Sequence, residues 1–204
     1  MAAMSALVIN CTLKSSPEPS NTEALAEKLT AALEEQDIRC EMLRAADFRI
    51  PPGVSTDQGG DDQWPEIRRK ILASQILILA SPTWLARPSS LAQRVLERMD
   101  AMLAETDDSG RPVAYNRVAG FVVTGNEDGA HHVISELAGA LIDIGFTVPG
   151  QCWTYWNRGP GPGDNYLSSD AGHDWSERTA RLAAHNIAAV ARALEQAPIP
   201  AASD

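Results

Sequence analysis

The sequence lacks the closely spaced cysteines that disulfide frameworks, zinc sites and iron–sulfur clusters need. It contains three cysteines, an odd number, far apart in the chain: Cys11, Cys40 and Cys152. We therefore expect free thiols, and neither a disulfide scaffold nor a metal site. Cys11 follows the first apolar run, where a nucleophile can lie, but a buried thiol that packs as a small apolar group is the favoured role.

Positive charge is also scarce. The 204 residues include 17 Lys and Arg against 27 Asp and Glu, which gives a net charge of −10. Nucleic acids and anionic membranes bind basic surfaces, so we expect neither as the main partner. No apolar run approaches the roughly 20 residues of a membrane-spanning helix, and the N-terminus has neither a basic region nor a secretory core. We expect a cytoplasmic protein without a membrane span.

Several motifs that would name a function are missing. The P-loop and the dinucleotide-binding pattern Gly-x-Gly-x-x-Gly are absent, as are Gly-x-Ser-x-Gly and His-Glu-x-x-His. These patterns mark nucleotide-binding loops, serine hydrolases and zinc proteases. The sequence therefore predicts no protein nucleophile and no catalytic metal.

The composition is ordinary for one globular domain. Apolar residues make up 44% of the chain and charged residues 22%. A chain of this length can bury one large core and is short for two. We predict a single domain over residues 1–197 and a disordered tail over residues 198–204.

Short apolar runs alternate with amphipathic helical segments along the chain. The continuous runs at 75–81 and 118–124, and the shorter run at 7–9, are typical of strands buried on both faces of a parallel sheet. An outer strand is expected at 38–43, and a fifth strand is expected to start at 146–148. This α/β pattern predicts a three-layer α/β/α sandwich around a five-stranded parallel sheet.

The first connection, from Thr12 to Thr22, has the chemistry to bind an anion. It is rich in hydroxyl groups, carries one cation, Lys14, and contains Ser20, which fits a capping box with Glu23 three residues later. Free N–H groups at a helix start bind phosphate groups. A phosphate site is one interpretation, and an ordinary strand-to-helix connection is the other.

Two further loops follow buried strands, at 82–88 and 124–131. Ligands of open parallel sheets bind outside the carboxyl ends of the strands, near the point where the strand order reverses. We therefore expect all three loops to meet at one edge of the sheet. A fourth loop, at 45–64, is longer than most connections and is expected to be either mobile or functional.

The three loops resemble those of the NAD(P)H-dependent FMN reductase family, in the flavodoxin-like superfamily, over about residues 5–150. The first is similar to the family's Ser-rich, basic segment with a Ser-Asn-Thr helix start. The second, Ser81 to Trp84, matches Ser-Pro-x-Trp, and Leu91 to Arg98 matches the helix that follows it in the family. The third is a Gly-containing loop after the fourth strand. The resemblance implies the sheet order 2-1-3-4-5 and bound FMN, with NADPH or NADH as co-substrate.

The FMN-binding residues that the resemblance implies lie in the same three loops, and their chemistry suits those roles. The residues expected at the phosphate are Thr12, Lys14, Ser15, Ser20, Asn21 and Thr22. The residues expected to form a wall beside the isoalloxazine, with the indole of Trp84 against it, are Pro82, Thr83, Trp84 and Leu85. The residues expected to bring backbone close to the flavin are Thr124, Gly125, Asn126, Glu127 and Gly129. One departure from the family is the longer first loop, in which Glu18 must point away from a phosphate.

The resemblance also implies the activity. FMN would accept a hydride at N5 and pass electrons to a small acceptor such as a quinone, an azo compound or free flavin, so no protein side chain is predicted to be catalytic. The candidates for the rim of the substrate site are His131, Trp153, Tyr155 and Trp156.

The family further implies a homodimer or homotetramer, and we expect the aromatic segment 153–166 to cover its own or a neighbour's site. Two alternatives to the reductase stay open at this point. One is a flavodoxin-type electron carrier, which binds FMN but oxidises nicotinamides poorly. The other is a non-redox binding module on the same fold.

Overall fold

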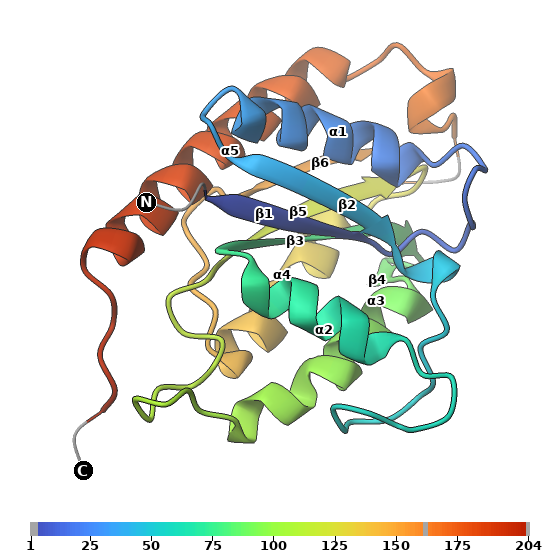
Figure 1. Ribbon diagram of the computed structural model, residues 1–204. Coiled ribbons are helices and arrows are strands. Elements are labelled where there is room, and N and C mark those ends of the chain that lie inside the picture. Colours follow the sequence, from blue (N-terminus) through green and yellow to red (C-terminus); the bar gives the residue numbers. More distant parts are fainter. Residues whose placement is uncertain (1–3, 161–162, 203–204) are drawn as a thin grey trace.

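A parallel sheet forms the middle layer of the protein (Figure 1). The computed structural model describes residues 4–160 and 163–202. The parallel strands are β1 (Ser5–Asn10), β2 (Arg39–Arg44), β3 (Ile76–Trp84), β5 (Val118–Gly125) and β6 (Trp153–Asn157). They lie in the order β2-β1-β3-β5-β6, and the short β4 (Arg87–Pro88) pairs antiparallel with the end of β3. Counted along the parallel strands alone, this is the predicted order 2-1-3-4-5, which is confirmed.

Helices cover both faces of the sheet, as the three-layer prediction requires. In Figure 1, α1 (Asn21–Glu34) and α5 (His173–Gln196) lie together on one face. The other face is covered by α2 (Trp64–Ala73), α3 (Ser90–Met99) and α4 (Ala130–Ile144). The described residues also form three short 3₁₀ helices: η1 (Ala45–Asp47), η2 (Asp100–Ala104) and η3 (Tyr166–Ser168).

The sheet is buried on both faces, because each central strand carries apolar side chains throughout. All six residues of β1 are buried, and Ile76 to Ala80 of β3 are each at most 1% exposed.

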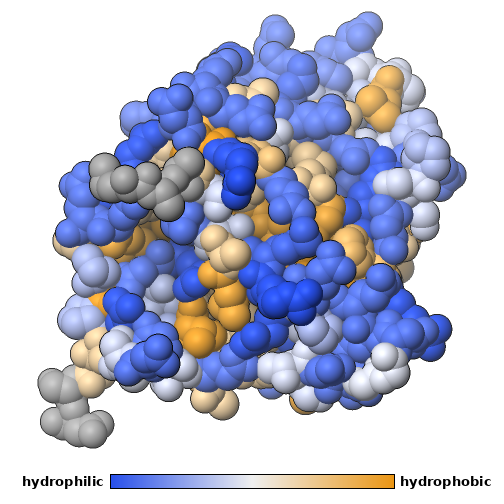
Figure 2. Space-filling view, viewed as in Figure 1, coloured by the Kyte–Doolittle hydropathy of each residue, from blue (hydrophilic) through white to orange (hydrophobic). Residues whose placement is uncertain are grey.

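The surface, unlike the core, is mainly polar. Hydrophilic side chains predominate on the face seen in Figure 2, in keeping with the net charge of −10. Among the described residues, the structure contains no helix that is long and apolar enough to cross a membrane.

The fifth parallel strand lies at 153–157, so the expectation of a strand starting at 146–148 was wrong. In that segment only Thr147 pairs, through a single bridge to Val118. The true edge strand alternates half-buried and buried side chains rather than forming an apolar run. An edge strand with one covered face and aromatic residues on the other lacks the continuous hydrophobicity that marks the inner strands.

The segment predicted as a loop at 82–88 is also more regular than expected. β3 continues to Trp84, and a tight turn at Leu85 and Ala86 leads into β4. Both turn residues have positive φ, 52° and 59°. Such a turn matches the twist of a hairpin but is ordinarily made by Asn-Gly or Asp-Gly, which is why its sequence gave no hairpin signal.

Some expectations concern residues at the limits of the description. The structure does not describe residues 1–3 at the start of the predicted domain or residues 203–204 at the end of the predicted tail. It also does not describe residues 161–162, within the glycine- and proline-rich stretch 159–163. Inside the segment predicted as a tail, the backbone of Ile199 exchanges two hydrogen bonds with the side chain of Asn116. The disorder of 198–204 stays a prediction.

The long loop before α2 is anchored by one buried arginine. Arg98 of α3 is fully buried and donates hydrogen bonds to the carbonyl oxygens of Pro51 and Ser55, at 3.1 and 3.0 Å. It also forms an ion pair with Asp62, at 2.7 Å, in which both side chains are enclosed. The guanidinium lies 5.6 Å from the ring centroid of Trp64. A single side chain therefore ties both ends of the loop to the core.

We expect Arg98→Ala to lower the free energy of unfolding by about 3–5 kcal/mol, because it leaves the Asp62 carboxylate buried without its partner. Urea unfolding followed by tryptophan fluorescence measures this change. Arg69→Ala, on the exposed side of α2, is the matched control and should change the free energy by less than about 0.5 kcal/mol. Equal, small effects of the two substitutions would contradict the anchoring role of Arg98.

Candidate functional site

The three loops predicted to converge do meet, around a hollow of about 370 Å³ at the carboxyl ends of β1, β3 and β5. The size is within the range of pockets that hold small ligands and cofactors. It lies where β1 and β3 are neighbours while the helices that follow them, α1 and α3, leave to opposite faces of the sheet. The residues that line it are Thr12, Leu13, Lys14, Asn21, Thr22, Pro82, Thr83, Trp84, Thr124, Gly125, Asn126, Trp156, Asn165 and Tyr166.

One end of the hollow offers hydrogen-bond donors and a positive charge. Among the described residues that line it, Lys14 is the only charged one. Its ammonium group donates one hydrogen bond, of 3.0 Å, to the carbonyl oxygen of Pro19, which leaves donors for a ligand. Because no carboxylate belongs to this described lining, the hollow can accept an anion although the protein is acidic overall.

The N-terminus of α1 adds further donors. The Ser20 hydroxyl accepts from the N–H of Glu23 at 3.2 Å, so Ser20 is the N-cap as predicted. The Glu23 carboxylate, however, binds Arg44 and not the Ser20 N–H, so only half of the predicted capping box is formed. In the described chain, no hydrogen bond occupies the N–H groups of Asn21 and Thr22 in the first turn.

A hydrogen bond connects the first loop to the third. The hydroxyl groups of Thr22 and Thr124 lie 2.7 Å apart, and both residues are buried. The two residues are 102 positions apart in the sequence. This contact holds the start of α1 against the end of β5, so the two sides of the hollow are fixed relative to each other.

Two buried hydroxyl oxygens in the lining, those of Thr83 and Tyr166, have no partner within the described part of the chain. Thr83 is 3% exposed, and its hydroxyl oxygen makes no hydrogen bond there. A buried hydroxyl without a partner costs free energy, so such atoms in binding sites are partnered by ligands. The Thr83 hydroxyl could bind a polar group of a flavin ring, and the hydroxyls and N–H groups around Lys14 fit the flavin phosphate.

The loop after β5 packs tightly against the strand ends. A Cβ atom at Gly125 would lie 2.9 Å from the carbonyl oxygen of Glu127 and 3.1 Å from the hydroxyl of Thr83. Gly125 is therefore required by the protein's own packing, a reason that the prediction of close approach to a ligand did not include.

The hairpin tip after β3 is held in its strained conformation by the same loop. The Glu127 carboxylate accepts a hydrogen bond from the N–H of Leu85 at 2.7 Å. Gly129 has a φ of 112°, and a Cβ there would lie 2.8 Å from Ala86. Non-glycine residues at positive φ persist only where the surroundings enforce them. The hairpin thereby presents Trp84, which is 53% exposed, along the hollow.

Several residues predicted for the flavin site do not line the hollow. The Ser15 hydroxyl lies 3.4 Å from the carbonyl oxygen of Ala46, and Leu85 is 88% exposed at the hairpin tip. Ser20, Glu127 and Gly129 support the hollow from behind, through the contacts described above.

The four predicted rim residues divide between two faces of β6. Trp156 lines the hollow and donates from its indole to the carbonyl oxygen of Ala171 at 2.7 Å. Trp153 and Tyr155 lie on the opposite face, where their rings are 5.4 and 5.0 Å from that of His131. Successive side chains of a strand point to opposite faces, so one strand cannot bring all of these rings to one site.

Three lining residues were not among the individual residues predicted for the site: Leu13, Asn165 and Tyr166. Asn165 and Tyr166 do belong to the segment 153–166, which was expected to cover a site. Tyr166 is 3% exposed and stacks on the His173 ring, with centroids 4.1 Å apart. The N–H of Leu167 donates to the side chain of Asn21 at 3.0 Å. The aromatic content of 153–166 indicated that this segment has a role at a site. Its position beside the start of α1 could not be predicted, because it depends on a contact between residues 146 positions apart.

Cys11 has the properties of a packed thiol. It is fully buried, and burial raises its pKa to about 12. At neutral pH the thiol therefore stays protonated, and the thiolate required of a nucleophile is not formed.

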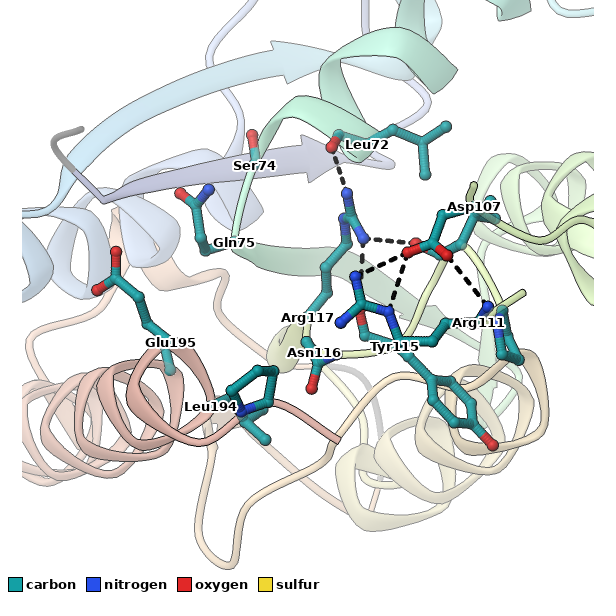
Figure 3. Close-up of a pocket in the computed structure, with 14 residues that line it drawn as sticks. Leu72, Ser74, Gln75, Asp107, Arg111, Tyr115, Asn116, Arg117, Leu194 and Glu195 are labelled. Atoms are coloured by element: carbon teal, nitrogen blue, oxygen red, sulfur yellow. Dashed lines mark hydrogen bonds and ion pairs between the residues drawn. The ribbon is translucent and has the colours of Figure 1, made fainter. Parts of the chain in front are cut away.

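A second hollow, of about 400 Å³, lies at the opposite edge of the sheet, beside the segments that precede β3 and β5. Figure 3 shows that Asp107, Arg111 and Arg117 of its lining are bound to one another or to backbone. Arg111 pairs with Asp107 at 2.8 Å, and Arg117 donates to the carbonyl oxygen of Leu72. The acidic groups Asp107 and Glu195 also belong to this lining, so the second hollow lacks the carboxylate-free, positively charged character of the first among the described residues.

Comparison with known proteins identifies the family of the chain. A family model described as NADPH-dependent FMN reductase matches residues 4–160. The 8-demethyl-8-aminoriboflavin-5′-phosphate synthase of Streptomyces davaonensis is 32% identical over 206 residues, which cover 96% of this chain and 80% of that protein. A divalent metal cation transporter, MntH of Mycobacterium bovis, is 36% identical over 205 residues, but these cover 97% of this chain and only 30% of the transporter.

Solved structures give the same fold. The crystal structure of RosB with the bound intermediate 8-demethyl-8-formylriboflavin-5′-phosphate has a TM-score of 0.90 and 31% identity, covering 97% of this chain and 82% of that one. An NADH:FMN oxidoreductase, EmoB, has a TM-score of 0.64 at 15% identity, covering 96% of this chain and 92% of that one, and shows likeness of fold alone.

We expect Thr83→Val to weaken FMN binding about fivefold without lowering the free energy of unfolding, because the lost hydroxyl has no partner in the described chain. Thr154→Val is the matched control. Its hydroxyl donates to the carbonyl oxygen of Ser176 at 2.8 Å, away from the hollow, so it should cost about 1 kcal/mol of stability and leave FMN affinity unchanged. Fluorescence titration and urea unfolding of both variants measure the contrast, and unchanged FMN affinity in Thr83→Val would refute it.

The family match covers β1 to β6, and thereby the strands and loops that form most of the hollow. The hydroxyls, the single lysine and the free N–H groups found there fit the phosphate and ring of FMN. The sequence, the fold and the site thus agree, and the chain belongs to the NADPH-dependent FMN reductase family of FMN-dependent, flavodoxin-like oxidoreductases.

Proposed function

We propose that this flavoenzyme oxidises NADPH or NADH and passes the electrons, through FMN held in the hollow, to a small-molecule acceptor. The observation that carries the proposal is the hollow at the carboxyl ends of β1, β3 and β5, with hydroxyls and one lysine in its lining and no carboxylate among the described residues there. When bound, FMN supplies the hydride acceptor and the electron relay.

The chain's own residues would then bind and orient the flavin. Lys14, the Thr12 hydroxyl and the first-turn N–H groups of α1 would hold the phosphate. Thr83 and the backbone near Asn126 offer polar contacts for the ring, and Trp84 offers an apolar face. Trp156 and Tyr166, both buried, close the side of the hollow toward α5 and exclude water there.

Two alternatives from the sequence are less well supported. The family match favours an enzyme over a non-redox module. It also favours a reductase over an electron carrier, although both would bind FMN. The homodimer or homotetramer implied by the resemblance stays a prediction.

Anaerobic mixing of the FMN-loaded protein with NADPH, and separately with NADH, tests the proposal. We expect the visible flavin absorbance to be lost at an enzymatic rate, on the order of 1–1,000 per second, with at least one nucleotide. Reoxidation by quinone, azo compound, free flavin, ferric ion or oxygen then ranks the acceptors. Slow loss of absorbance with both nucleotides would contradict the reductase and favour the carrier.

A second candidate function is suggested by the relative from Streptomyces davaonensis, whose name describes synthesis of an 8-amino flavin phosphate. The 0.90 TM-score to a structure holding a formyl flavin phosphate points the same way. In this alternative the flavin in the hollow is the substrate and is itself altered.

Mass spectrometry of the flavin after many turnovers separates the two candidates. If FMN is a cofactor, its mass is unchanged after repeated oxidation of NADPH or NADH. A shifted mass, in proportion to the protein present or in excess of it, would contradict the cofactor role and support flavin modification.

A further inference from the structure

The first turn of α1 contains a carboxylate that is badly placed for a phosphate site. Glu23 is the third residue of the helix, the position from which a Glu side chain ordinarily reaches back to the N-cap N–H in a capping box. The positive end of the helix dipole also attracts it there. A carboxylate at the Ser20 N–H would lie beside the free N–H groups of Asn21 and Thr22, and its negative charge would repel a phosphate group there.

Arg44, the last residue of β2, prevents this. Its guanidinium donates from Nε to the Glu23 carboxylate at 3.2 Å and from Nη2 to the other carboxylate oxygen. The residue is only 6% exposed, whereas the Glu23 side chain is 28% exposed. The forked contact neutralises the carboxylate and directs it toward β2.

The other terminal nitrogen of Arg44 binds the backbone of the first loop, residues 12–22. Its Nη1 donates to the carbonyl oxygens of Ser15 and Glu18, at 3.1 and 2.7 Å. Carbonyl oxygens repel phosphate oxygens, so turning two of them toward Arg44 also favours an anion on the other side of the loop.

The consequence is seen at the helix start. Within residues 4–160 and 163–202, no hydrogen bond occupies the N–H of Ser20, which a complete capping box would use. It stands next to the unoccupied N–H groups of Asn21 and Thr22, which line the hollow. Two donors of the lining residues, the N–H groups of Asn21 and Thr22, therefore stay available to a ligand, with no carboxylate at the Ser20 N–H beside them.

We propose that Arg44 is a positioning residue that reserves the N-terminus of α1 for the flavin phosphate by holding the Glu23 carboxylate away from the Ser20 N–H. This inference rests on the proposed function, since it takes FMN as the ligand of the hollow. It makes Arg44 and Glu23, neither of which lines the hollow, determinants of the preference for FMN over riboflavin, which lacks the phosphate.

The test compares FMN and riboflavin affinity in each variant by flavin fluorescence titration. In Arg44→Met the ratio of riboflavin to FMN dissociation constants should fall at least about tenfold, while riboflavin affinity itself changes less than about threefold. In the double variant Arg44→Met/Glu23→Gln the ratio should return to within about threefold of the wild-type value, because no free carboxylate remains. Lys28→Met removes one charge and one ion pair, with Glu177, elsewhere on α1 and should leave the ratio unchanged.

The outcomes separate the inference from the function it rests on. An unchanged ratio in Arg44→Met, or a double variant as impaired as the single one, overturns the inference while FMN binding by the wild type stands. A wild-type protein that binds neither flavin overturns the proposed function instead. If Arg44→Met does not fold, the double variant decides: a near-wild-type ratio supports the inference, and a tenfold loss refutes it.

Discussion

The side-by-side pairing of β1 and β3 is the constraint on which the rest of the structure depends. Because right-handed crossovers carry the chain from β1 toward one edge of the sheet and from β3 toward the other, α1 and α3 must lie on opposite faces. The connections after the two strands therefore diverge and leave a crevice between them. The residues that line the hollow are brought to this crevice by the end of a strand or by a segment that packs against it.

Two buried arginines fix loops to the core in the same way, one at the first loop of the crevice and one at the loop before α2. Arg44 binds the carbonyl oxygens of the first loop and a carboxylate of α1, and Arg98 binds carbonyl oxygens of the loop before α2 and the carboxylate of Asp62. A guanidinium can satisfy several acceptors at once without losing its charge. The loops are thereby fixed to the core by polar contacts.

The sequence predicted the elements that have a strong local pattern and did not predict those that lack one. The inner strands were predictable because runs such as 75–81 are apolar without interruption, as a doubly covered strand must be. The edge strand at 153–157 and the hairpin at 83–88 were not predictable. The strand mixes aromatic and polar residues without an apolar run, and the hairpin makes its turn with Leu and Ala. Among the site residues, Thr12, Lys14 and Trp84 could be placed from local motifs, whereas Tyr166 reaches the hollow only through packing against the start of α1.

The sequence by itself determined the α/β architecture, the order of its elements and the three loops that follow buried strands, because hydrophobic runs and helix caps are local properties of the chain. Only the tertiary structure decided which groups of those loops face the hollow and which support it, and that Glu23 is turned to Arg44 and not to the helix start. The reason is physical: the direction of a side chain depends on partners that the fold brings together from distant parts of the chain, and here the decisive partner, Arg44, lies 21 residues beyond Glu23, at the end of the neighbouring strand.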